Sequence, residues 1–416
     1  MDDLGHDEPQ ELLGEDRIEA RLLGERPQAR DLSLLALGIG GREADLGLVT
    51  ADVLGHLESL GEQVHQGGID VVDARSVLVE LLVGHAEVTL PDHRLGARSR
   101  ARYVRRMSDL PLLFVDHPFP DLYRDLVDGR AIVCGSGSDE RLDAADAVIA
   151  GATRLWDATA FALAPRLRVI SRVGVGYDNV RVADAAAAGV VVCNTPWAPT
   201  VSTAEHTMAL LFAITKHLPH QIDRARRGLP GEPVGRSLEL DGRVLGLIGI
   251  GRIATRVAVA AQALGMRVIA SDPGVAAPPL PGVELVGLPD LLAAADVVSI
   301  HAPALPSTIG MFDERAFAAM KPGAYLVNCA RGVLVDHAAL LAAIDRGHLA
   351  GAGLDVTDPE PLPAGHPLLD RANVVITPHV ASASVAGRRR LYEHAIDNAL
   401  AVLDGRPATV VPLPTT

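Results

Sequence analysis

Short apolar runs alternate with helix-like patterns along residues 111–403. The runs are dense in Val, Ile and Leu, which is typical of parallel strands that are buried on both faces. Loops with Pro, Gly and Asp separate the runs from the helical segments. This alternation predicts an α/β protein whose parallel sheets are covered by helices. We predict strands at residues 112–115, 131–134, 147–150, 169–173, 190–193, 244–250, 267–271, 297–301, 325–329, 352–356 and 374–377, and helices at 119–127, 180–188, 252–264, 290–295, 314–320 and 337–344.

A long helical pattern at residues 201–227 divides these strands into two groups. Ser202 and Glu205 are placed where they could cap its start. We expect a flavodoxin-like domain over residues 107–199 and a Rossmann-like domain over residues 200–379. The last helical pattern, at 384–403, is expected to cross back, so that residues 380–416 complete the first domain and make it discontinuous.

Residues 1–106 do not share this organisation. Their leucines come in short bursts that glycines interrupt, and Tyr103 is their only aromatic residue. So few large apolar side chains make a packed core hard to build. We therefore predict that residues 1–106 are an atypical N-terminal extension, either poorly structured or not native, and that the functional chain begins at Met107. A small regulatory domain is the alternative.

The net charge and the cysteines limit the classes of partner and the cell compartment that we expect. The net charge of −14 argues against nucleic acid and anionic membranes as partners. The three cysteines, Cys134, Cys193 and Cys329, are far apart and lie in apolar patterns, which indicates a reduced, cytoplasmic protein. We see no metal-ligand spacing, no apolar run long enough to cross a membrane and no signal peptide. We therefore predict no metal site.

A Gly-x-Gly-x-x-Ala turn, residues 249–254, follows the predicted strand at 244–250 and opens a helix. Gly249 suits the tight turn, Gly251 lets a pyrophosphate approach the backbone, and Ala254 is small enough for the helix to pack on the strand. The phosphates would bind the helix N-terminus. Asp272, at the end of the next strand, would bind the ribose hydroxyls and repel a 2′-phosphate. The motif therefore predicts NAD rather than NADP.

Arg331, Glu360 and His379 follow the ends of later strands, the edge at which open α/β sheets bind ligands. A guanidinium can hold a substrate carboxylate through two parallel hydrogen bonds. An imidazole can move the hydroxyl proton while hydride leaves the same carbon, and a carboxylate can orient that ring. Each residue alone could be a surface or capping residue. Together they predict hydride transfer at a carbon next to a carboxylate.

At these residues the chain resembles the D-isomer-specific 2-hydroxyacid dehydrogenase family, which includes phosphoglycerate dehydrogenases and glyoxylate/hydroxypyruvate reductases. The resemblance covers about residues 111–405. It implies an NAD-dependent enzyme that interconverts a D-2-hydroxy acid and its 2-keto acid. The domain at 107–199 would bind the substrate, the domain at 200–379 would bind the nucleotide, and a homodimer would be joined through the nucleotide domain. The motifs that carry it are the turn at 249–254 and residues 174–179, 328–332, 355–361 and 378–379.

The resemblance also implies roles for individual residues. Arg331 would bind the substrate carboxylate and carbonyl, and Glu360 and His379 would form the acid–base pair. The substrate carboxylate would also meet the backbone of Val173, Gly174, Val175 and Gly176. Cofactor contacts are implied for Gly249, Gly251, Arg252, Ile253, Asp272, Cys329, Ala330, Asp355 and His379.

Two other functions remain open. One is a non-enzymatic NAD(H)-sensing binder like the transcriptional corepressors on this fold, which the intact Arg–Glu–His set disfavours. The other is a dehydrogenase that prefers NADP, which Asp272 disfavours. Glu360 argues against formate as the substrate, because formate dehydrogenases of this superfamily carry Gln there. Arg154 and Arg172 are the only basic residues that we can place near a phosphorylated substrate.

Overall fold

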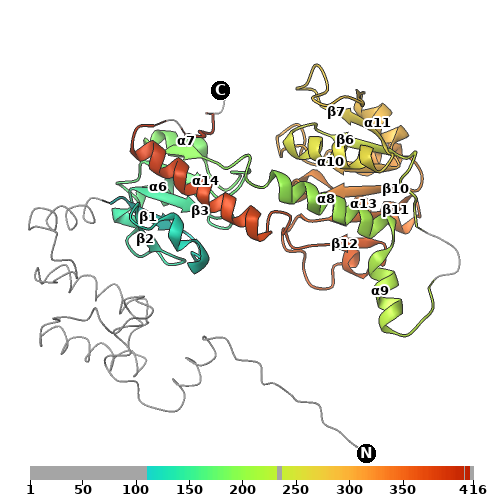
Figure 1. Cartoon of the computed structure of the whole chain (residues 1–416), viewed down its shortest axis with the longest axis horizontal. Coiled ribbons are helices and arrows are strands. Elements are labelled where there is room, and N and C mark those ends of the chain that lie inside the picture. The colour runs from blue at the N-terminus through green and yellow to red at the C-terminus, as the bar shows by residue number, and fades with distance from the viewer. Residues whose placement is uncertain (1–109, 232–236, 407, 413–416) are drawn as a thin grey trace, which may run out of the picture. The chain divides into compact units, whose positions relative to one another are not determined.

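The computed structural model describes residues 110–231, 237–406 and 408–412 (Figure 1). The predictions for residues 1–106 lie outside this part of the chain. The described residues form two parallel sheets with helices on their faces, so the predicted α/β fold class is confirmed.

The first sheet has the strand order β2-β1-β3-β4-β5, and every pair is parallel. This is the flavodoxin-like order predicted for the substrate domain. β1 and β3 are buried along their whole length, as expected of central strands with helices on both faces. The strands are β1 (Leu112–Val115), β2 (Ile132–Gly135), β3 (Ala147–Ala150), β4 (Val169–Arg172) and β5 (Val191–Cys193).

Helix α14 (Val385–Leu403) covers one face of this sheet although it comes last in the chain (Figure 1). Tyr392, Ile396 and Ala399 are buried in one apolar cluster with residues of β1 and β3. The first lobe is therefore built from two separate stretches of chain, while the domain boundaries at residues 199 and 379 stay predictions. Short helices α6 (Ala158–Ala162) and α7 (Val182–Ala187) and the 3-10 turn η2 (Leu142–Ala144) complete this lobe.

The second sheet has the order β12-β11-β10-β9-β6-β7-β8, again with parallel pairs only. The chain winds outward from β6 first through β7 and then through β9, so the topological switch point of a Rossmann sheet lies between β6 and β9. The strands are β6 (Val244–Ile248), β7 (Arg267–Ser271), β8 (Val283–Leu285), β9 (Val297–Ile300), β10 (Ala324–Asn328), β11 (Leu349–Leu354) and β12 (Val374–Ile376).

The helices of this lobe follow most of the predicted positions. Helix α8 lies directly on β11, since a Cβ at Gly353 would be 3.0 Å from the Cβ of Leu210. The helices are α8 (Thr200–Thr215), α9 (Leu218–Arg226), α10 (Arg252–Ala263), α11 (Leu288–Ala294), α12 (Glu314–Ala319) and α13 (His337–Asp345), with 3-10 turns η3 (Gly332–Leu334) and η4 (Pro367–Asp370). None of the helices in the described residues is long and apolar enough to cross a membrane.

Four local predictions were wrong. The helix at 201–227 is two helices, because His217 adopts a left-handed φ of 50° and a proline opens α9. Ser202 does not cap α8; its hydroxyl bonds Ser384 Oγ at 2.6 Å. The helix at 119–127 is the 3-10 turn η1 (Asp121–Leu126), whose buried Tyr123 and Leu126 are three residues apart. Strand β8 was missed, since it has only three residues and follows a proline-rich loop.

Candidate active site

The dinucleotide turn has the geometry that its glycines predict. Gly249 has a φ of 86°, and a Cβ there would lie 3.1 Å from the carbonyl oxygen of His301. Gly251 precedes α10 and has no heavy atom within 4 Å of its Cβ position. Ala254 is fully buried against the sheet. The turn therefore leaves open space at the N-terminus of α10, where backbone N–H groups and the helix dipole favour a pyrophosphate.

Asp272 stands at the end of β7 and closes this turn. Its Oδ2 accepts a hydrogen bond from Ile250 N–H at 2.9 Å, and its Oδ1 accepts one from Gly274 N–H at 2.9 Å. The carboxylate is half-buried, so it retains access to a ligand. The contact of Asp272 with the ribose stays a prediction. Its structural role in the turn is observed, and the sequence did not indicate that role.

Arg252, the first residue of α10, stacks on Trp197 from the loop after β5. The guanidinium carbon lies 5.2 Å from the centre of the indole ring, a cation–π distance. Ile253 follows it and is partly buried. Trp197 was not among the predicted site residues, because no sequence pattern indicates which distant side chain a guanidinium will meet.

The buried side chain of Asn328, at the end of β10, holds the backbone of Arg331 in place. The amide of Asn328 donates to the carbonyl of Arg331 at 2.8 Å and accepts from Ala330 N–H at 2.9 Å, which closes a tight turn. The guanidinium of Arg331 then donates to Asp178 Oδ2 at 3.1 Å. A Cβ at Gly176 would overlap its Nη2 atom, so a side chain at this position would displace the guanidinium. The structure therefore brings Arg331 against the predicted substrate loop.

That loop, Val173 to Gly176, offers backbone donors. Val173 and Gly174 already donate to backbone carbonyls, whereas the N–H groups of Val175 and Gly176 have no acceptor among the described residues. Free N–H groups beside a guanidinium form a site for a carboxylate. Arg172, just before the loop, is largely buried; burial and then the nearby charge of Arg331 lower its pKa to about 10.

Glu360 and His379 are hydrogen-bonded to each other. Nδ1 of His379 lies 2.6 Å from Glu360 Oε1, and 45 % of the imidazole and 39 % of the carboxylate side chain are exposed. Both groups can therefore meet a small molecule. The loop that carries Glu360 packs against the turn after Arg331, since a Cβ at Gly332 would overlap the backbone of Thr357.

The three side chains come from neighbouring strands at one sheet edge. Arg331 follows β10, Glu360 follows β11 and His379 follows β12, and these strands are adjacent and parallel. The sequence prediction placed them at strand ends. Their catalytic roles remain predictions.

Asp355, the first residue after β11, is buried with 1 % of its surface exposed. Its carboxylate accepts from Thr377 Oγ1 at 2.6 Å and from the N–H groups of Val380 and Ala381 at 2.9 Å each. Burial by itself raises the pKa of Asp355, but hydrogen bonds from His206, Thr377 and these N–H groups outweigh it and keep the pKa below its ordinary value. The expected nicotinamide contact stays a prediction.

Cys329 and Ala330 lie between Asn328 and Arg331 and are both partly buried. Burial raises the pKa of the Cys329 thiol to about 12. A neutral thiol is a poor nucleophile, so Cys329 shapes the site rather than reacting there. Among the described residues, no group of three or more His, Cys, Asp and Glu side chains could hold a metal ion.

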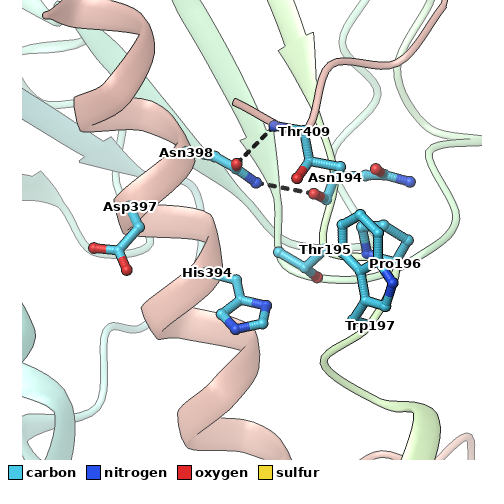
Figure 2. A pocket seen from close by; sticks show the side chains of 8 residues that line it. All are labelled: Asn194, Thr195, Pro196, Trp197, His394, Asp397, Asn398 and Thr409. Atoms are coloured by element: carbon cyan, nitrogen blue, oxygen red, sulfur yellow. Dashed lines mark hydrogen bonds between the residues drawn. The ribbon is translucent and has the colours of Figure 1, made fainter. Parts of the chain in front are cut away.

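A separate pocket lies between α14 and the loop after β5 (Figure 2). His394 and Trp197 stand on opposite sides of it. Asn398 ties the two walls together, since its amide donates to Asn194 O at 2.9 Å and accepts from Thr409 N–H at 2.9 Å. The pocket contains none of the predicted site residues.

Comparison with known proteins decides the family. The model of the "D-isomer specific 2-hydroxyacid dehydrogenase, NAD binding domain" family matches residues 208–381. Over 273 residues the chain is 39 % identical to a glyoxylate reductase of Korarchaeum cryptofilum, covering 64 % of this chain and 82 % of that protein. The chain belongs to the D-isomer specific 2-hydroxyacid dehydrogenase family. The prediction of NAD as the cofactor is confirmed by the match to the family's NAD-binding domain.

A second relative and a solved structure are also similar to this chain. The D-3-phosphoglycerate dehydrogenase of Mycobacterium tuberculosis is 42 % identical over 248 residues, covering 59 % of this chain and 47 % of that protein. The chain thus spans about half the length of the phosphoglycerate dehydrogenases it matches. The structure of Aquifex aeolicus D-lactate dehydrogenase with NAD and lactic acid superimposes with a TM-score of 0.64 at 29 % identity, covering 71 % of this chain and 96 % of that chain.

Proposed function

We propose that this protein is an NAD-dependent D-2-hydroxyacid dehydrogenase that interconverts a D-2-hydroxy acid and its 2-keto acid. The observation that carries the proposal is the 2.6 Å hydrogen bond between His379 and Glu360 at the strand ends where Arg331 also emerges. An exposed imidazole that is oriented by a carboxylate suits an acid–base role, and Arg331 at the same sheet edge suits the binding of an anion.

In keto-acid reduction, Arg331 and the free N–H groups of Val175 and Gly176 bind the substrate carboxylate. Arg331 exchanges Asp178 for the substrate, because both present a carboxylate to the same guanidinium. Glu360 accepts a hydrogen bond from Nδ1–H of His379, which leaves Nε2 of the ring to deliver a proton to the carbonyl oxygen. The cofactor would supply the hydride for the carbonyl carbon when bound.

The turn at Gly249 and Gly251 fits a dinucleotide, since the space beside Gly251 is open at a helix N-terminus. Asp272 would accept hydrogen bonds from the ribose hydroxyls of NAD. Arg252, held by Trp197, would cover the pyrophosphate from outside. These residues bind and orient the cofactor, while the chain's own acid–base pair moves the proton.

The surroundings of the basic residues favour a small, non-phosphorylated substrate. Arg154 is already paired with Asp139 and stacks on Trp156, 4.7 Å from the ring centre. Arg172 donates to Val173 O at 2.5 Å and to Asn179 Oδ1 at 3.3 Å. Because both guanidinium groups already have partners within the protein, we expect a 2-keto monocarboxylate to bind better than a phosphorylated keto acid.

A spectrophotometric screen tests the proposal. Glyoxylate, hydroxypyruvate, pyruvate, 2-ketoisocaproate and 3-phosphohydroxypyruvate are each mixed with NADH and the protein, and the loss of absorbance of NADH is followed. We expect turnover of at least one non-phosphorylated keto acid. Binding of NADH with no turnover of any of the five would instead favour an NAD(H)-sensing binder.

We also propose that the protein is a homodimer joined through the nucleotide domain, and that it works in the reduced cytoplasm. Support for the dimer comes from α9, which has no buried residue in the described chain. Leu218 and Ile222 lie on one side of α9, four positions apart, and are 43 % and 47 % exposed. Exposed apolar residues grouped on one face are typical of an interface.

A further inference from the structure

The turn that carries His379 is held by Asp355. His379 N–H donates to the backbone oxygen of Asp355 at 2.8 Å, and the N–H groups of Val380 and Ala381 donate to its carboxylate. His379 itself has a φ of 53°, in the left-handed region that L-residues rarely adopt. Because the hydrogen bonds at and just after His379 keep it in that conformation, the direction of its imidazole depends on where Asp355 lies.

Asp355 is in turn fixed by side chains from two other elements. Thr377, directly after β12, donates its hydroxyl to Asp355 Oδ1 at 2.6 Å. His206, on α8, places Nε2 3.0 Å from Thr377 Oγ1 and 3.3 Å from Asp355 Oδ1. Since the hydroxyl proton of Thr377 is used on Asp355, the Thr377 oxygen is left to accept from Nε2–H of His206.

This arrangement makes His206 the outer end of a chain of hydrogen bonds. A buried carboxylate needs donors on all sides, and His206 is the one donor that reaches Asp355 from outside the β11–β12 region among the described residues. The imidazole cannot shift freely, because α8 is packed onto β11 at Leu210, one turn after His206. Loss of the Nε2–H donor would free both Thr377 and Asp355 to move.

We propose that His206 is a positioning residue for the reaction: it holds Thr377 and Asp355, and through them the left-handed turn that directs His379. The inference rests on the proposed function, because it takes His379 as the acid–base residue. His206 acts only through other residues. It should therefore influence mainly the chemical step, and NADH binding only through Asp355.

The test compares three variants on the same helix. His206→Leu fills the space without a donor, His206→Gln keeps a donor near the position of Nε2, and Thr215→Val is the matched control. Thr215 is buried on α8, and its hydroxyl bonds only Leu211 O of the same helix, at 2.7 Å. For each we measure kcat and KM with the best keto acid of the screen, the Kd of NADH and the melting temperature.

We expect His206→Leu to lower kcat about tenfold or more, since small misplacements of a catalytic group have effects of this size. The Kd of NADH should change by a smaller factor than kcat, because His206 could influence the cofactor only through Asp355. His206→Gln and Thr215→Val keep kcat close to that of the wild type. Wild-type kcat in His206→Leu would overturn the inference, and so would an equal loss in His206→Gln, which would mean a packing role.

A second measurement does not depend on turnover. In protein labelled with 13C and 15N at histidine, the ring signal of His379 is assigned by its loss in His379→Ala. We expect this signal to shift in His206→Leu and to stay in place in Thr215→Val; an unmoved signal in His206→Leu contradicts the inference. If the wild type reduces none of the keto acids, the proposed function fails. The NMR signal of the His379 ring then still tests whether His206 positions His379.

Discussion

Asp272 has one observed function and one expected function. Its carboxylate accepts hydrogen bonds from the N–H groups of Ile250 and Gly274, which shape the cofactor turn, and we expect it to bind the ribose. Its negative charge, rather than its shape, is what disfavours a 2′-phosphate. A substitution to Asn removes the charge and keeps one of the two acceptor oxygens, so it also loses one of the two backbone hydrogen bonds, and the melting temperature shows how much this loss costs.

We predict that Asp272→Asn lowers the preference for NADH over NADPH by about tenfold, because a repulsion worth about 1.4 kcal/mol corresponds to that factor. The change is measured as the ratio of kcat/KM for the two cofactors. The melting temperature serves as the control for the turn. An unchanged ratio with an unchanged melting temperature would mean that Asp272 does not select the cofactor.

The sequence could predict that Arg331, Glu360 and His379 come after the ends of neighbouring strands, because those strands are recognisable and adjacent parallel strands end at one edge. It could not predict His206 or Trp197. Both contact side chains that are distant in sequence, and no local pattern tells which helix will cover a given strand. The hydrogen bonds that Asp355 accepts could not be predicted from the sequence for the same reason.

At the scale of elements, the turn between β6 and α10 contains two glycines that are needed for different reasons. Gly249 has a φ of 86° and lies against the backbone of His301. Gly251 has an ordinary φ and open space at its Cβ position. The first glycine is required by the fold, and we expect the second to be required by the ligand.

We predict that Gly249→Ala destabilises the protein by about 1–2 kcal/mol, the cost of a left-handed L-residue, and also weakens NADH binding. Gly251→Ala should leave the melting temperature unchanged and weaken NADH binding alone, because its methyl group meets only the cofactor. Thermal unfolding and NADH fluorescence titration separate the two. Equal effects of the two substitutions on the melting temperature would refute this division of roles.

The elements that the sequence missed share a physical cause. β8 and η1 are too short to show a period, and the break between α8 and α9 comes from the left-handed His217, a conformation that no residue other than glycine signals clearly. The long buried strands and α14, by contrast, were predicted correctly because their apolar patterns extend over many residues.

For the whole molecule, the exposed face of α9 leads to a prediction about assembly. The double variant Leu218→Asp and Ile222→Asp should be monomeric, because two buried charges at an interface cost more than the apolar contact contributes. Light scattering after size-exclusion chromatography measures the mass, with Leu122→Asp as the control, an exposed leucine of the first lobe. A wild-type protein that is monomeric, or a double variant that still dimerises, would contradict the predicted interface.

The central claim is that His379, oriented by Glu360, is the acid–base group of a keto-acid reductase. The most direct test is the kcat of His379→Ala with NADH and the best keto acid, together with the Kd of NADH. Loss of proton-transfer catalysis should lower kcat by about 10²–10⁴-fold while NADH binds within about twofold of the wild-type affinity. A kcat close to that of the wild type, with NADH still bound, would contradict the account.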